Sequence, residues 1–140
     1  MTLDNQSLFS DGQALTNTLS GSATSVSTVS ESTLDWKNHG DDVGHYLAWF
    51  VMLTEGAGAG TSTLNAALQT SADNSSWETV SSKTVTAPAA GAFVVDGDAL
   101  PSGLKRYVRV NYTIGTAEFT TAPKVTAGLV REGTNKKRQG

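Results

Sequence analysis

The sequence predicts an all-β domain with the layout of a sandwich or jelly roll. Short β-rich runs are separated by clusters of Gly, Asn, Asp and Ser, and no segment has the 3.6-residue periodicity of an amphipathic helix. Residues 105–114 alternate most cleanly. Their apolar side chains fall on one face of an extended chain, namely Val108, Val110, Tyr112 and Ile114. The other face holds Tyr107, Arg109, Asn111 and Thr113, which predicts a strand with one buried side.

Eight strands are expected along the chain, because each β-rich run is bounded by residues that favour turns. They cover residues 25–29, 33–36, 45–54, 62–70, 78–85, 92–95, 105–114 and 124–130. The run over residues 62–70 also alternates, with an inward set of Leu64, Ala66 and Leu68 and an outward set of Thr63, Asn65, Ala67 and Gln69. It therefore predicts a second half-buried strand.

The run from Tyr46 to Leu53 is apolar on both faces. One interpretation is a central strand whose second face is covered by loops or by the N-terminal segment. The other is a strand whose second face lies in a subunit interface. The sequence leaves both interpretations open.

The remaining segments define the expected organisation of the chain. Residues 1–20 are polar with few apolar side chains and predict an extended N-terminal arm, residues 21–131 form the sandwich domain, and residues 132–140 predict a disordered basic tail. The GAGAG sequence at residues 56–60 predicts a flexible connector. Asp96 and Asp98, in VDGDAL, predict a turn, because the later Glu of a calcium loop is missing.

Length and composition indicate one domain held together by packing alone. The chain has 140 residues and no cysteine, which excludes disulfides and thiolate chemistry. No signal-peptide pattern occurs at the N-terminus. The longest apolar run, residues 45–53, is far shorter than the roughly 20 residues that a membrane-spanning helix requires. We therefore expect a soluble protein made in the cytoplasm.

The net charge of −3 conceals an asymmetry along the chain. Residues 1–100 hold 11 acidic and 2 basic residues, a net charge of −9, whereas residues 101–140 hold 2 acidic and 8 basic residues, a net charge of +6. Either these charges alternate in space once the chain folds, or they orient the protein toward copies of itself or toward a partner.

Few residue clusters have the chemistry of a catalytic or binding site. His39, Asp41, Asp42 and His45 are the only group with metal-ligand chemistry, but a third histidine is absent and Gly40 and Gly44 favour a turn. A jelly-roll metal enzyme that uses His39 and His45 is therefore an alternative. No serine lies in a nucleophile elbow. We expect no enzyme and no cofactor.

The tryptophans and the basic tail have two interpretations each. Trp36 and Trp77 match the stacking platforms of carbohydrate-binding β-sandwiches, an alternative function, whereas Trp49 lies in the apolar run and is expected in the core. Three cations, Lys136, Lys137 and Arg138, are better explained as a solvated end than as a nucleic-acid contact.

Four passages carry a resemblance to a known family. They are TLDNQSLFSDGQALT (residues 2–16), AALQTSAD (66–73), LPSGLKRYVRVNYT (100–113) and TAGLV (126–130). In their order and spacing the chain resembles the capsid cement, or decoration, proteins of tailed bacteriophages of the Bordetella phage type. It departs from them in the acid-rich segment over residues 30–43 and in a longer, more basic tail after Val130.

This resemblance implies a single-domain, jelly-roll-like β-sandwich that binds the outer capsid surface of the virion. Such a protein assembles as a homodimer or homotrimer and clamps neighbouring subunits of the major capsid protein. The resemblance implies no catalysis, cofactor, nucleic-acid partner or membrane partner, and it supplies no active-site residues.

Two sets of contact residues are predicted from this interpretation. Leu3, Leu8 and Phe9 are expected to anchor the N-terminal arm on a neighbour. Lys105, Arg106 and Arg109 are expected to contact acidic groups of the capsid or of a sister subunit.

Overall fold

The computed structural model describes residues 8–17, 25–35, 47–58, 60–100, 104–115 and 117–131. These residues form strands and no helix, which confirms the all-β prediction. The strands are β1 (Leu8–Ala14), β2 (Ser25–Val29), β3 (Leu34–Asp35), β4 (Leu47–Ala57), β5 (Thr63–Ser71), β6 (Glu78–Thr86), β7 (Phe93–Ala99), β8 (Tyr107–Gly115) and β9 (Thr121–Arg131). Within this part of the chain, no helix has the length and apolar character to cross a membrane.

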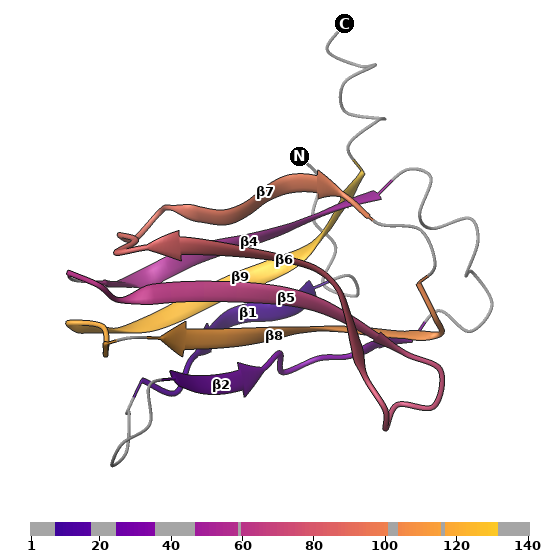
Figure 1. Cartoon of the computed structure of the whole chain (residues 1–140). Coiled ribbons are helices and arrows are strands. Elements are labelled where there is room, and N and C mark those ends of the chain that lie inside the picture. The colour runs from indigo at the N-terminus through magenta and orange to yellow at the C-terminus, as the bar shows by residue number, and fades with distance from the viewer. Residues whose placement is uncertain are drawn as a thin grey trace, which may run out of the picture.

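Two antiparallel sheets pack face to face (Figure 1). The four-stranded sheet has the order β1-β9-β4-β7, and the five-stranded sheet has the order β2-β8-β5-β6 with β3 also paired to β8. Most connections pass from one sheet to the other, and the hairpin between β5 and β6 stays within one sheet. This is the topology of a jelly-roll-like β-sandwich.

Alternating side chains on β5 and β8 supply much of the core between the sheets. Val108, Val110, Tyr112 and Ile114 are all buried, as predicted, and Leu64 and Leu68 on β5 are buried beside them. The four-stranded sheet contributes the opposite layer of the core: Phe9, Trp49, Val51, Leu53, Val95, Val125, Ala127 and Leu129. Trp49 is a core residue, as expected.

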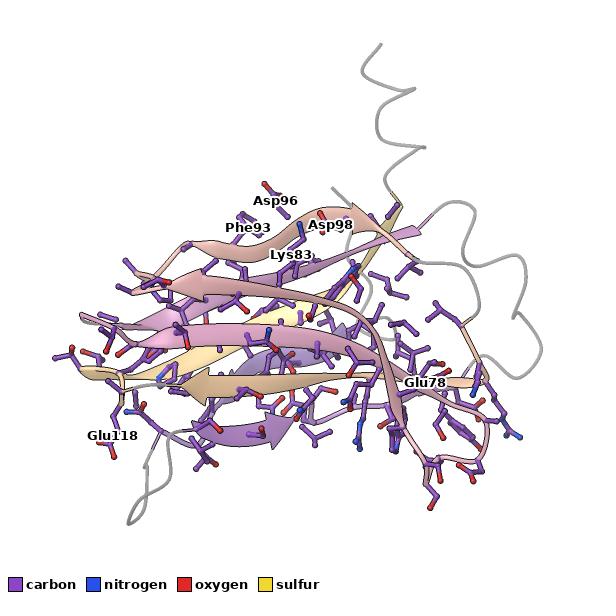
Figure 2. The ribbon with its side chains drawn as sticks, viewed as in Figure 1. Glu78, Lys83, Phe93, Asp96, Asp98 and Glu118 are labelled. Atoms are coloured by element: carbon purple, nitrogen blue, oxygen red, sulfur yellow. The ribbon has the colours of Figure 1, made fainter. Side chains whose placement is uncertain are left out.

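The sandwich is closed on the side where β1 and β2 lie. The Ser10 hydroxyl is 2.7 Å from the Tyr112 hydroxyl, and the Gln13 side-chain amide donates to the Val29 carbonyl. The Thr16 backbone N–H donates to the Thr28 hydroxyl. These bonds tie β1 and the residues that follow it to β2 and β8 of the other sheet. On the opposite side, Lys83 of β6 and Asp98 of β7 form an ion pair at 3.3 Å (Figure 2).

The structure differs from the expected segment boundaries in three places. Residues 8–14, expected within an arm, form β1 on the edge of the four-stranded sheet. The GAGAG sequence is not wholly a connector, since β4 continues to Ala57. The VDGDAL sequence lies in β7 and is not a turn. In β7, Val95 pairs with Val51 and Asp98 pairs with Trp49, so an extra residue is accommodated as a bulge at Gly97, whose φ is 69°.

The second face of β4 is covered mostly within the chain itself. Ala48 and Phe50, on the outer face of the four-stranded sheet, are 0% and 3% exposed, and Leu8 of β1 packs against them. This favours cover from the N-terminal region for these two residues. Met52, further along the same face, is half-buried and pairs with Phe93 of β7.

Candidate interaction surfaces

Most of the outer face of the five-stranded sheet is a lattice of uncharged polar side chains, with the exposed Val29 of β2 next to Asn111. Residues paired in register share a face of the sheet, so the pairs of β5 with β6 and β8 define this surface. Its members on these three strands are Thr63, Asn65, Ala67, Gln69, Ser71, Thr79, Ser82, Thr84, Thr86, Tyr107, Arg109, Asn111 and Thr113. Asn65 donates to the Thr84 hydroxyl at 2.8 Å, and Ser27 of β2 shares a hydrogen bond with Thr113. The side chains are therefore held in position by one another.

Arg109 and Trp77 form an anchor at one end of this lattice. The guanidinium carbon Cζ of Arg109 lies 4.1 Å from the centroid of the Trp77 ring, in cation–π geometry. The Arg109 Nε–H donates to Gln69 Oε1 at 2.9 Å, and Gln69 in turn donates to the Thr79 hydroxyl at 3.3 Å. Partial burial lowers the pKa of the Arg109 guanidinium, which keeps its charge at neutral pH.

A turn between β5 and β6 places Trp77 under this guanidinium. The Asp73 carboxylate oxygen Oδ1 accepts hydrogen bonds from the Ser71 hydroxyl and from the backbone N–H groups of Ser75 and Ser76. These bonds, led by that from Ser76, lower the pKa of Asp73. Because Trp77 follows directly, the acid-organised turn fixes where its ring lies.

The other two predicted cations have carboxylate partners in the same chain. Lys105 lies 3.1 Å from Glu78, and Arg106 binds Asp35 through both Nε and Nη2, at 2.8 and 3.1 Å. The Asp35 hydrogen bond raises the pKa of Arg106. All three predicted cations therefore lie at one end of the five-stranded sheet. Lys105 and Arg106 have carboxylate partners, whereas Arg109 has an aromatic ring and an amide oxygen.

The charge asymmetry along the chain is partly resolved in space. Lys105, Arg106 and Lys124 come from the basic C-terminal part, and their partners Glu78, Asp35 and Glu55 come from the acidic N-terminal part. Each pair joins residues far apart in sequence. The first interpretation of the asymmetry therefore holds for these three cations.

A second candidate surface lies on the outer face of the four-stranded sheet. Phe93 is 39% exposed on the edge strand β7 and pairs with half-buried Met52 on β4. Figure 2 shows Phe93 and Asp96 together on the outward side of β7, whereas Asp98 and Lys83 lie between β7 and β6. Phe93 and Met52 together form a small apolar patch at the edge of this sheet, and this patch is the second candidate surface.

The predicted arm residues occupy different environments. Phe9 is fully buried in the core of its own chain, which corrects the expectation that it anchors on a neighbour. Leu8 is half-buried against Ala48 and Phe50. The reason is the pairing of β1 with β9, which draws these side chains into their own sandwich. Leu3 lies outside the described residues, and its contact with a neighbour stays a prediction.

Several other predicted features also lie outside the described residues. They are the His39, Asp41, Asp42 and His45 group, Trp36, and the basic tail over residues 132–140. Within the described ranges, no group of three or more His, Asp or Glu side chains is placed to hold a metal ion. Trp77, the described tryptophan of the proposed sugar platform, has Arg109 over its ring.

The sequence identified Arg109 as a contact residue and Trp77 as a possible sugar platform, but it gave no sign that the two stack, and it missed Gln69 and Phe93 as parts of these surfaces. Alternation placed Gln69 on the outer face of β5 but carried no information on its partner across the sheet. Phe93 was expected in a short strand, and its pairing with Met52 depends on the register between β4 and β7. A polar turn that ends in tryptophan is the one local signal that could have identified Trp77.

The model of the protein family Bbp16 matches residues 9–129, a range that begins in β1 and ends in β9. No curated protein matches the chain. The matched range includes both candidate surfaces.

Proposed function

The chain belongs to the Bbp16 family of Bordetella phage proteins, and from this membership we propose that it is a capsid cement protein. In this function it binds the outer surface of a phage head and clamps neighbouring subunits of the major capsid protein. It acts as a homodimer or homotrimer, without catalysis, cofactor, nucleic acid or membrane. The family match over residues 9–129 is the observation that carries the proposal.

The geometry supports this function by offering two separate contact surfaces. The polar lattice and the Trp77–Arg109 anchor lie on the outer face of the five-stranded sheet. Phe93 lies on the outer face of the four-stranded sheet. A protein that bridges two neighbours needs contacts on more than one side, and a sandwich of two rigid sheets holds such surfaces at a fixed separation.

The proposed stabilisation follows from mass action. A protein that binds the assembled shell and not the free subunit shifts the equilibrium toward the shell by its binding free energy, and the effect is repeated at every copy. Such binding requires no chemistry at the surface. It requires flat complementary faces and a few buried anchors.

Heads that lack this protein provide the direct test. Purified protein added to such heads is expected to raise the temperature at which they release DNA, measured with a dye that fluoresces on exposed DNA. Phe93→Ser is expected to weaken this protection while the protein stays folded with a modestly lower unfolding midpoint, because Phe93 is 39% exposed on an edge strand. Glu118→Gln, which changes an exposed side chain far from Phe93 in Figure 2, serves as the control.

Two results would count against the proposal. Heads that release DNA at the same temperature with and without the protein contradict the cement function. Equal protection by the wild type and Phe93→Ser contradicts the part assigned to Phe93.

A further inference from the structure

Arg109 differs from the other cations that the structure describes. Four lysine and arginine side chains in this part of the chain lie beside carboxylates: Lys83, Lys105, Arg106 and Lys124, at 3.3, 3.1, 2.8 and 3.6 Å. Arg109 has an aromatic ring and an amide oxygen as its partners within the described residues. Its charge is therefore not compensated by a carboxylate of this part of the chain.

The guanidinium is also preorganised for a further ligand. Its Cζ lies over the Trp77 ring and Gln69 accepts from Nε, so two contacts hold the side chain before any partner arrives. Neither Nη group has an acceptor among the described residues. Two Nη groups in a fixed plane form the fork that binds a carboxylate with two parallel hydrogen bonds.

We propose that Arg109, held between Trp77 and Gln69, is the receptor for an aspartate or glutamate side chain on the surface of a capsid subunit. The inference rests on the proposed function and narrows it. It makes the outer face of the five-stranded sheet the face that meets the capsid subunit. It assigns the contact with the capsid carboxylate to Arg109 and not to Lys105 or Arg106, because the charges of those two are already paired within the chain.

The surroundings of Arg109 favour a protein partner of this chemistry. The lattice on β5, β6 and β8 is uncharged apart from Arg109. A partner surface that faces it is therefore electrostatically complementary when it places one carboxylate opposite Arg109. Tryptophan and arginine are the residues that most often dominate the free energy of protein–protein binding. Hydroxyl and amide groups around them provide the polar rim of such an interface.

A second copy of this chain fits the same face poorly. A two-fold axis close to Arg109 would bring the Arg109 side chains of both copies together, at a cost in electrostatic free energy, and an axis at the middle of the face would set each Arg109 against uncharged side chains at the other end of the lattice. The described carboxylate on this face is that of Asp35, and Arg106 already binds it with two hydrogen bonds. A sugar is also disfavoured, because Arg109 covers a face of Trp77 that a sugar ring would use.

Binding of single variants to heads that lack the protein tests the inference. Arg109→Met is expected to weaken the affinity at least about thirtyfold, the effect of losing a hot-spot residue. Arg109→Lys keeps the charge without the fork and is expected to lose about tenfold. Lys105→Met changes the net charge by the same amount as Arg109→Met, and a loss of no more than about threefold is expected, because an exposed ion pair contributes little.

Fluorescence of the tryptophans and the thermal unfolding midpoint show whether each variant is folded. Should Arg109→Met fail to fold, Arg109→Lys carries the test, since a loss below about threefold in that variant overturns the inference. If Arg109→Met folds and binds heads with the affinity of the wild type, the inference is overturned. An equal loss in Arg109→Met and Lys105→Met, which would mean that net charge alone matters, also overturns it.

Two further outcomes separate this inference from its alternatives. Wild-type protein that does not bind heads contradicts the proposed function, and the inference with it. Wild-type protein that binds heads while Arg109→Met binds equally well contradicts the inference alone. Free N-acetylneuraminate or glucuronate that binds Arg109 at micromolar concentration, and displaces the protein from heads, would assign the site to an acidic sugar and overturn the proposed protein partner.

Discussion

At the scale of single residues, the buried hydroxyl pair of Ser10 and Tyr112 joins the two sheets. The two oxygens lie 2.7 Å apart, and the side chains are only about 1% exposed. The Ser10 hydroxyl also donates to Gln13 at 2.6 Å. Because the phenol has little access to water, ionising it in the folded protein is unfavourable, and burial raises the pKa of Tyr112 well above 10.0.

This shift predicts a loss of stability in alkali. The folded protein keeps the phenolic proton that the unfolded chain releases above about pH 10, so the unfolded state binds fewer protons there. The contribution of Tyr112 is fully present below pH 10 and is lost as the pH rises toward its folded pKa. The free energy of unfolding should fall by up to about 1.4 kcal/mol per pH unit from this group. Urea denaturation at several pH values measures the slope.

Tyr112→Phe identifies the source of that slope. The variant loses the hydrogen bond with Ser10 and is less stable at pH 8, but its free energy of unfolding should depend less on pH above 10. Tyr107→Phe, at a half-buried position on the outer face of β8, serves as the control and should keep the wild-type slope. An unchanged alkaline slope in Tyr112→Phe contradicts the assignment.

At the scale of strands, β4 and β9 are joined by a close approach at Gly56. The pairing shifts register on both sides of Glu55. Gly56 has a φ of 112°, and a Cβ atom there would lie 2.7 Å from the backbone Cα of Pro123. Both the backbone conformation and the contact therefore require glycine.

Gly56→Ala should destabilise the protein by about 3 kcal/mol or more, because it combines backbone strain with a clash against backbone that cannot move aside. Gly60→Ala is a matched control, since Gly60 has a φ of 58° and open space around its Cα. It should cost only the roughly 1–2 kcal/mol of a left-handed non-glycine residue. Chemical denaturation of both variants measures the difference. Equal losses would show that the contact with Pro123 does not matter.

The strands also show how far the sequence could predict the fold. In β8 and β5, strict alternation identified the buried face because the sandwich core selects for it directly. In β1, the sequence LFSDGQA lacks alternation and contains Gly12 at a φ of 66°. Its strand structure depends on pairing with β9 and on bonds from Asp11 and Gly12 to the side chains of Glu31 and Thr126. Such tertiary contacts leave no local pattern.

For the candidate surfaces, as for the strands, the sequence predicted which face a residue lies on but not which residues it contacts. Alternation placed Arg109 on an outward face, but its stacking on Trp77 depends on the register of three strands and on the turn around Asp73. The same limit applies to Lys105 and Arg106, whose partners come from β6 and β3. Periodicity predicts the face of a residue but not its neighbour across the sheet.

At the scale of the whole molecule, folding pairs most of the described cations with acids and leaves Arg109 as the exception. Pairing across the sequence lowers the local charge at one end of the five-stranded sheet, through Lys105–Glu78 and Arg106–Asp35, and on the four-stranded sheet, through Lys124–Glu55. The described features open to a partner include one preorganised guanidinium and the exposed Val29 on the outer face of the five-stranded sheet, and the exposed Phe93 on the opposite sheet. A molecule of this kind is suited to bridging neighbours by shape and a few anchors.

The central claim is that the protein binds an assembled phage head and not its separate subunits. Sedimentation of the protein with heads that lack it, and in parallel with purified unassembled capsid subunits, tests this claim most directly. We predict saturable binding to heads at a fixed small-integer ratio to the major capsid protein, with an affinity for unassembled subunits at least about 100-fold weaker. Protein that stays in the supernatant with heads, or that binds free subunits equally well, would contradict the account.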